Sequence, residues 1–594
     1  MEVADCDPTE RARVDGSCNS LSNPVRGTFF EPVYRELDPH YFNGSYPRKA
    51  FDGSDLPLPK VIRNALLAEG KAINMKFTSA VPTYGIYTFG DVASIHDLLQ
   101  FLRNKTDCCT EEGMKSPGCS PVFVPEDDPL HRFTGIRCLN LTTPLVYSDF
   151  GCTNDTVPSP VERGTACLDL SVCYDAAGHG DSAIRSYEGG LLATVVDDDG
   201  IIWPPNGNGY CAANQPGETR CFGNYPTALL SGTILGIWYM RQHNHFAKQL
   251  ASVNPGWDDE KLFQTARYIN IAFANQVYLY EWCSSTMGYE NLVKAGVLSD
   301  NDGFRDVYDE STYPQVSLEY TYVLRWFHTM QDATANMYDA DGNFLKAFPY
   351  VNGTFRPGFL GIDKNIVKFT QHFYRQNTAA ADFIVDPDLS QNGVPYLQRS
   401  VDITASDLYK SRLLGFAPYT DYVTLCTGHN ITSFDDLAEH MDLERIELMK
   451  KIYNHHTEID LMAGIWAEKI LEGGSIPATL ACLLIKFLQK LITYDRHWYE
   501  SPNRPYAFTE AQLAEMRKSS LAALMCNVGD EVSVVQPHAF LVISDDNPLT
   551  PCSDIPNIDI SAWYDETANG SDYTDSTCDE SASGDASSTT DTTY

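Results

Sequence analysis

Apolar residues recur every three to four positions through much of this chain, and this period constrains its fold more than any other feature. Residues 241–283 predict two long amphipathic helices, joined by a turn at Pro255 and Gly256 with Asp258 near the start of the second. Strand patterns are few and short. The other predicted elements are helices at Ser317 to Tyr338, Leu443 to Asn454, Glu458 to Leu471, Pro477 to Ile492 and Thr509 to Cys526, and strands at Gly200 to Trp203 and Glu531 to Gln536.

We therefore expect one large, mainly α domain over residues 1–560, with few short strands and a disordered acidic tail at 561–594. The tail is rich in Ser, Thr and acidic residues and has too little apolar surface to order itself. After Lys518 the chain has no Lys or Arg, whereas fourteen acidic residues follow between Asp530 and Asp591.

The formal net charge of the chain is −36. So negative a field disfavours nucleic-acid backbones and anionic membrane surfaces, because binding to both depends on basic side chains. We expect neither as a partner. The charge favours cations, mineral surfaces or basic matrix proteins as partners of the tail, and the alternative is that the acids serve solubility alone.

Seventeen cysteines are many for a cytosolic protein, and their spacing matches no zinc-ligand pattern. Cys108, Cys109 and Cys119 share a short loop, as do Cys211 and Cys221, which fits disulfides formed in an oxidising compartment. The odd count leaves a free thiol or an intermolecular bridge, with Cys578 as the candidate. Seven N-x-S/T sequons also agree with a secreted, extracellular glycoprotein. The N-terminal residues carry no apolar signal segment, so we expect a mature chain.

Eight short motifs follow one another between Asp15 and Phe540. Together they resemble the animal haem peroxidase family, and this resemblance implies a mostly helical fold around a deeply buried b-type haem. The motifs are DGSCNSLSNP (Asp15 to Pro24), DDPLHR (Asp127 to Arg132), RQHNHFAKQL (Arg241 to Leu250), NPGWDDEKLFQTAR (Asn254 to Arg267), EIDLMAG (Glu458 to Gly464), DRHWYE (Asp495 to Glu500), FTEAQLAEMRKSSLAALMC (Phe508 to Cys526) and VQPHAF (Val535 to Phe540).

The segment LRWFHT, from Leu324 to Thr329, falls where the family has its R-x-G-H motif. The resemblance makes His328 the axial ligand of the haem iron and Arg325 a partner of a haem propionate, and the three-residue spacing puts both on one helix face. The alternative is a core histidine beside a surface arginine. Two departures weaken the ligand assignment: Phe327 replaces a glycine, and Tyr396 stands where the family has the asparagine that accepts the imidazole N–H.

On the opposite side of the haem, the resemblance aligns His96 with the catalytic distal histidine. Peroxide cleavage also needs a cation to stabilise the leaving oxygen. The family's arginine aligns with Tyr225, and no arginine occurs from Cys221 to Met240. Val92 replaces the family's glutamine, and Arg220 lies just outside the segment as a possible displaced substitute. Losing both groups predicts that peroxide cleavage is slower by several orders of magnitude.

The family's calcium loop corresponds to LSVCYDAAG, Leu170 to Gly178. With Asp97, the resemblance implies side-chain oxygens from Ser171 and Asp175 and the carbonyl of Cys173 as calcium ligands. Ala177 replaces one hydroxyl ligand, which leaves the set near the lower end of the six to eight oxygens that calcium takes. The alternative is a loop held by hydrogen bonds alone.

Two functions of different classes follow from these observations. The first is a secreted peroxidase homologue with haem b and calcium, whose activity toward hydrogen peroxide and small reductants is weak or lost. The second is a non-enzymatic acidic component of an extracellular matrix, for example a calcified one. A haem-binding module without turnover is a third.

Overall fold

The computed structural model describes residues 5–41, 47–92, 107–116, 118–144, 146, 159–174, 184–207, 211–222, 229–391 and 401–569. Helices form most of the regular structure within these ranges, and each sheet there has two strands. The prediction of a mainly α fold with few short strands is confirmed.

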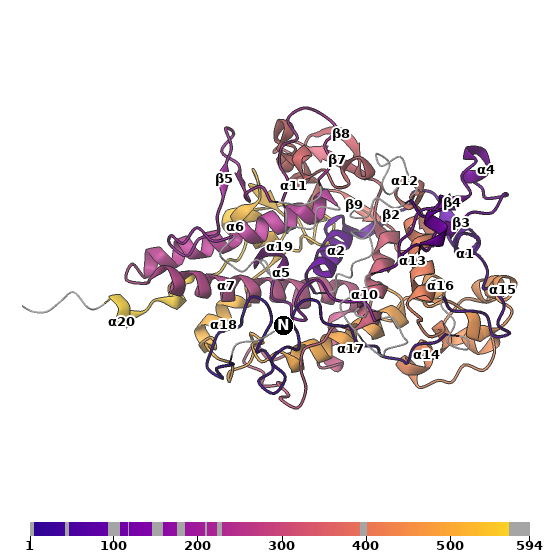
Figure 1. The fold of residues 1–594 in the computed structure, drawn as a ribbon. Coiled ribbons are helices and arrows are strands. Elements are labelled where there is room, and N and C mark those ends of the chain that lie inside the picture. The colour runs from indigo at the N-terminus through magenta and orange to yellow at the C-terminus, as the bar shows by residue number, and fades with distance from the viewer. Residues whose placement is uncertain are drawn as a thin grey trace, which may run out of the picture.

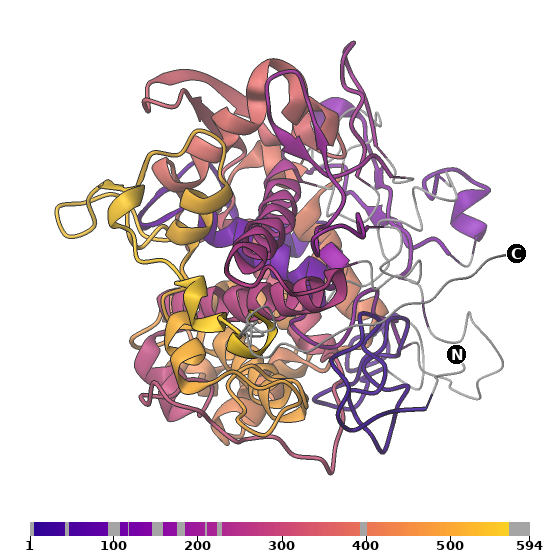
Figure 2. The same cartoon turned by 90° about the vertical axis from the view of Figure 1, so that its left-hand side faces the viewer.

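Two long helices form the centre of the molecule, α6 (Leu230–Val253) and α7 (Asp259–Gln276), which lie side by side in both views (Figures 1 and 2). The predicted helix pair is confirmed, and the Asp258 side chain caps α7 by accepting the backbone N–H of Lys261 at 2.8 Å. Every residue from Leu230 to Asn244 is buried, so α6 begins well before the amphipathic pattern that predicted it. A helix covered on all sides has no polar face for periodicity to reveal.

The other helices surround this pair. α7 continues into the π-helix η5, and α2, α5, α19 and η13 contact α6. The α-helices are α1 (Pro59–Leu66), α2 (Ala80–Val92), α4 (His131–Thr134), α5 (Ser171–Tyr174), α8 (Ser284–Met287), α9 (Tyr289–Lys294), α10 (Leu318–Val323), α11 (Asn365–Arg375), α12 (Pro387–Gln391), α13 (Ile403–Leu413), α14 (Tyr419–Thr427), α15 (Leu443–Ile452), α16 (Leu461–Ala467), α17 (Ala478–Tyr494), α18 (Glu510–Met516), α19 (Leu521–Val528) and α20 (Glu566–Asn569). The 3-10 and π segments are η2 (Gly113–Lys115), η5 (Val277–Cys283), η6 (Leu324–Met330), η7 (Tyr350–Gly353), η8 (Pro357–Lys364), η10 (Asp435–Glu439), η11 (His456–Glu458), η12 (Cys552–Asp554) and η13 (Ile560–Trp563).

The strands form six separate pairs, of which β1 with β10 is parallel and the others are antiparallel. The predicted strand regions hold β6 and β11. The strands are β1 (Ala68–Glu69), β2 (Ile73–Thr78), β3 (Val122–Phe123), β4 (Cys138–Leu139), β5 (Val195–Val196), β6 (Ile202–Trp203), β7 (Thr334–Tyr338), β8 (Phe344–Pro349), β9 (Asn377–Ala379), β10 (Ile384–Val385), β11 (Val534–Val535) and β12 (Thr550–Pro551).

The prediction of one helix from Ser317 to Tyr338 is wrong at its C-terminal end. The helical part ends at Met330, and Thr334–Tyr338 forms β7, which pairs with β8 across a turn at Gly342. Burial alternates along β7, so its apolar residues occupy one face of a strand. Similarly, the helix predicted from Thr509 to Cys526 divides into α18 and α19, because Ser520 caps a new helix by accepting the N–H of Ala523.

Six disulfides link the described part of the chain, which confirms the pairing of cysteines within short loops. Cys167, Cys173 and Cys283 are buried thiols in that part, whereas the candidate Cys578 lies outside it. The disulfides are Cys6–Cys18, Cys108–Cys119, Cys109–Cys138, Cys211–Cys221, Cys426–Cys482 and Cys526–Cys552.

The chain continues as packed structure beyond residue 560. Trp563 in η13 is buried, and its carbonyl accepts a hydrogen bond from the Asn254 amide at 3.0 Å. Asp565 accepts from the Trp257 indole at 3.0 Å and pairs with Lys261. Across the residues that the structure describes, none of the helices combines the length and apolar character needed to cross a bilayer.

Candidate functional site

His328 lies near the end of η6, which continues α10 without a break. Ser317 caps α10 by accepting the N–H of Tyr320, and this cap fixes where the helical segment begins. The His328 imidazole is about one-fifth exposed, and its Nδ1 lies 2.8 Å from Oδ2 of Asp407 in α13. A carboxylate at this distance accepts the Nδ1 proton, and in a neutral imidazole this leaves Nε2 with its lone pair.

Asp407 is buried and collects several positively charged or polar neighbours. Its Oδ1 lies 3.4 Å from Nη1 of Arg325 and 3.6 Å from Nζ of Lys410, and its carbonyl accepts the hydroxyl of Tyr322 at 2.9 Å. Burial alone would raise the pKa of this carboxyl, but His328, Lys410 and Arg325 together lower it. Asp407 therefore stays ionised and holds His328 and Arg325 in one cluster.

Sequence reasoning missed Asp407 because the family motif directed attention to Tyr396, which lies outside the described residues. In the sequence, Asp407 and Lys410 are three apart and resemble an ordinary surface ion pair on a helix. No local pattern singled out Asp407 among the carboxylates that follow Tyr396. The contact itself depends on α13 packing against η6.

Phe327 does not point toward open space. Its ring is fully buried, with its centroid 5.1 Å from that of Trp282 and 5.4 Å from that of Trp326. Gly85 in α2 faces the same cluster, since a Cβ built there would lie 2.9 Å from Trp282 and 3.7 Å from Phe327. The Phe327 side chain, which replaces the family's glycine, is thus packed in the core between α2, η5 and η6.

A group of buried tyrosines extends from this cluster toward α6. Tyr278 and Tyr320 share a hydrogen bond of 2.7 Å between their hydroxyls, and Tyr84 and Tyr239 share another. Burial raises the pKa of each of these hydroxyls above the ordinary tyrosine value. These phenols therefore stay neutral at ordinary pH.

The predicted calcium residues are only partly described, because Asp97 and Asp175 lie outside the described ranges. The Ser171 hydroxyl lies 3.0 Å from both a carboxylate oxygen and the carbonyl of Asp91 in α2. The Cys173 thiol lies 3.4 Å from the Tyr87 hydroxyl. These contacts join α5 to α2 by hydrogen bonds, and calcium binding stays a prediction.

Asp91, which the sequence did not single out, is buried at this junction. Burial raises its pKa to about 6, although the hydroxyl of Ser171 and the backbone N–H groups of Val172 and Leu170 oppose the shift. A bound cation would oppose it further. Asp91 is therefore the carboxylate to which the described part of the predicted calcium loop is attached.

The predicted distal residues lie outside the described part of the chain, which omits His96 and Tyr225. Val92, at the glutamine position, is buried and apolar. The Arg220 guanidinium lies 4.3 Å from the ring centre of Trp203, and its Nη2 lies 3.2 Å from Asp197. Its contacts are with the β5–β6 hairpin, so Arg220 is positioned by this hairpin rather than by α6.

Comparison with known proteins now adds to this geometry. The family model of animal haem peroxidase matches residues 12–540, and the chain belongs to that family. A peroxidase of Drosophila melanogaster is 29% identical, with 94% of this chain and 84% of the relative covered. A chorion peroxidase of the same fly is 26% identical over 93% of this chain and 70% of its own. A human peroxidasin homologue is 25% identical, and this chain spans 38% of it.

Solved structures agree on the fold. Peroxidase A from Dictyostelium discoideum superposes with a TM-score of 0.72 at 20% identity, over 89% of this chain and 99% of its own. The fatty acid alpha-dioxygenase of Oryza sativa gives a TM-score of 0.68 at 16% identity, over 91% and 89%. At these identities the likeness concerns the fold alone.

Proposed function

We propose that this protein is a secreted, haem-binding oxidoreductase scaffold whose peroxide turnover is weak or lost. The observation that carries the proposal is the 2.8 Å contact between His328 Nδ1 and Asp407. An imidazole that ligates a metal commonly donates its other N–H to a carboxylate or carbonyl, which orients the ring and raises its basicity. Here the partner is a buried, ionised carboxylate, so the His328 side chain is suited to bind an iron through Nε2.

The surrounding residues fit this role. Phe327 is packed into the core, and the Asp407 carboxylate also holds Arg325, the residue expected near a haem propionate. When bound, haem would supply the redox chemistry with peroxide. The chain's own part is to hold the imidazole of His328 and to orient its ring through Asp407.

Weak turnover follows from the sequence between Cys221 and Met240, which contains no arginine. A preorganised cation or donor facing the developing charge contributes about 10²–10³-fold to the rate. The contacts of Arg220 with Asp197 and Trp203 support the proposal that it does not take this role. We therefore expect the protein to bind haem but to react only slowly with hydrogen peroxide.

Secretion is supported by the six disulfides, which persist in oxidising compartments.

A second function of another class is an acidic, non-enzymatic component of an extracellular or calcified matrix. It is favoured by the C-terminal segment after Lys518, which has fourteen acidic residues and no Lys or Arg. The two functions can coexist in one chain, because they use different parts of it.

The deciding experiment is an absorption titration of the purified full chain with haem, followed in the Soret region. We expect one haem per chain, loss or a large shift of the band in His328→Ala, and an altered band with a raised iron reduction potential in Asp407→Asn. His538→Ala, an exposed histidine elsewhere, is the matched control and should behave as wild type. A wild type that binds no haem, or a band unchanged in His328→Ala, would refute the proposal. Addition of peroxide then measures turnover.

A further inference from the structure

We propose that His429, Glu439 and His440 form a binding site for a transition-metal dication such as Zn²⁺, separate from the His328 region. One ligand atom from each side chain lies within 4.8 Å of the other two. Nδ1 of His429 and Oε2 of Glu439 are 3.6 Å apart, and the two imidazole centroids are 5.9 Å apart. The three residues lie between α14 and α15, in a loop that contains η10.

The backbone brings these residues together. α14 ends at Gly428, whose φ of 73° places it in the left-handed region and turns the chain back at His429. The carbonyl of His429 accepts the Thr424 hydroxyl at 3.1 Å, and the carbonyl of His440 accepts the Lys469 N–H at 2.8 Å. Both histidine backbones are therefore fixed, although eleven positions separate them in sequence.

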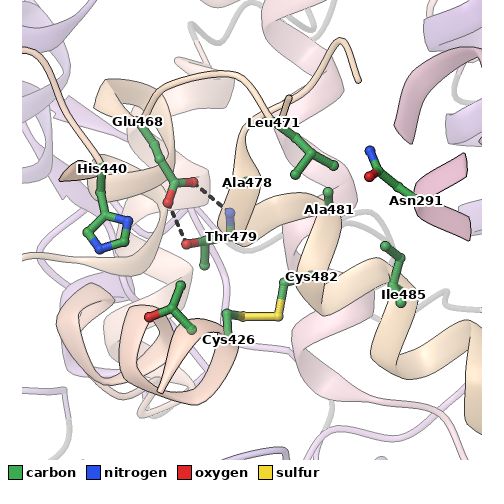
Figure 3. A pocket seen from close by; sticks show the side chains of 11 residues that line it. Asn291, Cys426, His440, Glu468, Leu471, Ala478, Thr479, Ala481, Cys482 and Ile485 are labelled. Carbon is green, nitrogen blue, oxygen red and sulfur yellow. Dashed lines mark hydrogen bonds between the residues drawn. A yellow bond between two sulfur atoms is a disulfide. The ribbon is translucent and has the colours of Figure 1, made fainter. Parts of the chain in front are cut away.

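The His440 side chain carries an independent sign of a missing partner. Its Nε2 is buried, and no hydrogen-bond partner for it occurs among the described residues. The imidazole lines a pocket of about 260 Å³, whose walls include Glu468, Thr479 and the Cys426–Cys482 disulfide (Figure 3). The Glu468 carboxylate accepts hydrogen bonds from Tyr419 and Thr479, and among the described residues it makes none with His440 Nε2.

The chemistry of the three ligands selects the class of metal. Two imidazole nitrogens and one carboxylate oxygen match the three-ligand zinc sites that keep one position open. With bonds of about 2.0–2.1 Å, ligand atoms of a tetrahedral site lie about 3.4 Å apart. The distance between His429 Nδ1 and Glu439 Oε2, 3.6 Å, is close to this value. The two side chains are 43% and 77% exposed, so they are free to move the remaining distance toward a metal. Calcium is disfavoured because it takes six to eight oxygen ligands.

Lys469 is a neighbouring positive charge that opposes a cation. Its Nζ lies 3.0 Å from the carbonyl of Ala438 and 3.4 Å from that of Glu439, so it binds the end of η10 and leaves the Glu439 carboxylate available. A bare His429–Glu439 ion pair at this exposure would contribute little to stability. Binding of a metal gives the loop a cross-link between its two ends.

The test is calorimetric titration of the metal-free full chain with Zn²⁺, with Co²⁺ absorption as the probe of coordination. We expect one high-affinity equivalent, weakened at least tenfold in His429→Ala and in Glu439→Gln, and a thermal midpoint that Zn²⁺ raises in wild type but raises less in these two variants. His538→Ala and Glu447→Gln replace matched exposed residues and should leave the affinity unchanged. Circular dichroism confirms that each variant is folded.

The His328→Ala variant separates the metal site from the proposed haem site. It should lose haem binding but bind Zn²⁺ as wild type does. Equal Zn²⁺ affinity in wild type and His429→Ala would overturn the metal site, and so would the absence of a saturable equivalent. A stoichiometric site that disappears in His328→Ala would overturn it as well.

Discussion

At the scale of single residues, Asp407 determines how His328 and Arg325 are held. The folded chain keeps its pKa below the ordinary 3.8, because His328, Lys410 and Arg325 outweigh the effect of burial. Folding therefore favours the ionised form. The stability that Asp407 contributes is complete above the ordinary pKa and is lost as the pH falls through the lowered value.

Asp407→Asn should lower the free energy of unfolding at pH 7 by about 3 kcal/mol, because the buried charges of its partners lose their counter-ion. Urea unfolding followed by fluorescence measures this difference. The gap between variant and wild type should narrow below pH 4, as protonation removes the same charge from wild type. A gap that stays constant from pH 7 to pH 3 would show that the charge of Asp407 contributes nothing.

The pKa of Glu281 is shifted in the opposite direction, upward. Burial raises its pKa to about 8, and while Oε2 accepts the N–H of Leu521 at 2.8 Å, Oε1 is buried without a hydrogen-bond partner. Its folded pKa lies above its ordinary 4.5, so its contribution lowers stability as the pH rises from about 5 to 8. Glu281→Gln should be more stable than wild type at pH 8 and differ little at pH 5, as thermal midpoints at the two pH values will show.

At the scale of elements, α2 approaches η5 and η6 closely at Gly85. A methyl group there would lie 2.9 Å from Cζ2 of Trp282, a rigid ring whose Nε1 donates to the carbonyl of Val81 at 2.8 Å. Gly85→Ala should therefore lose about 1–3 kcal/mol through overpacking, although alanine is the better helix former. Trp282→Phe removes the contacting atom, so the double variant should lose less than the sum of the single ones. Additive losses in denaturant unfolding would argue against the contact.

The disulfide between Cys426 and Cys482 ties α14 to α17 across 56 residues, whereas Cys211 and Cys221 are 10 apart. Closing a longer loop removes more entropy from the unfolded chain. Replacing both cysteines of the longer link by serine should lower the stability by about 4 kcal/mol, against about 3 kcal/mol for the shorter one. Unfolding midpoints of the two double variants test this order. Equal losses would show that loop length is not the deciding factor.

At the scale of the whole molecule, charge is distributed unevenly along the chain. Residues 570–594 contain six acidic side chains and no basic one, whereas residues up to Asn569 are joined to the domain through Trp563 and Asp565. A deletion that begins after Asn569 keeps these contacts.

Deletion of 570–594 should leave the thermal midpoint unchanged and reduce adsorption to calcium carbonate, because the negative charges nearest the mineral are removed. Adsorption isotherms at low and high salt measure the effect, which salt should weaken. A variant with the six acids replaced by their amides is the matched control for length. Equal adsorption of all three proteins would exclude this segment from any role in mineral binding.

Sequence by itself determined the features that depend on local pattern. The motifs identified the family, periodicity identified the central helix pair, and cysteines close in sequence indicated the short disulfide loops. Local patterns suffice where a residue interacts mainly with neighbours along the chain, as Asp258 does with Lys261. They also placed His328 and Arg325 on one turn.

Tertiary structure decided the rest. Asp407 reaches His328 only because α13 packs against η6, and Thr334–Tyr338 is a strand only because β8 pairs with it. Phe327 is tolerated because Trp282 and Gly85 leave it a place in the core. The same holds for His429 and His440, which meet through a turn that a helical pattern does not encode. In each case the deciding energy comes from partners distant in sequence, and a local pattern carries no information about them.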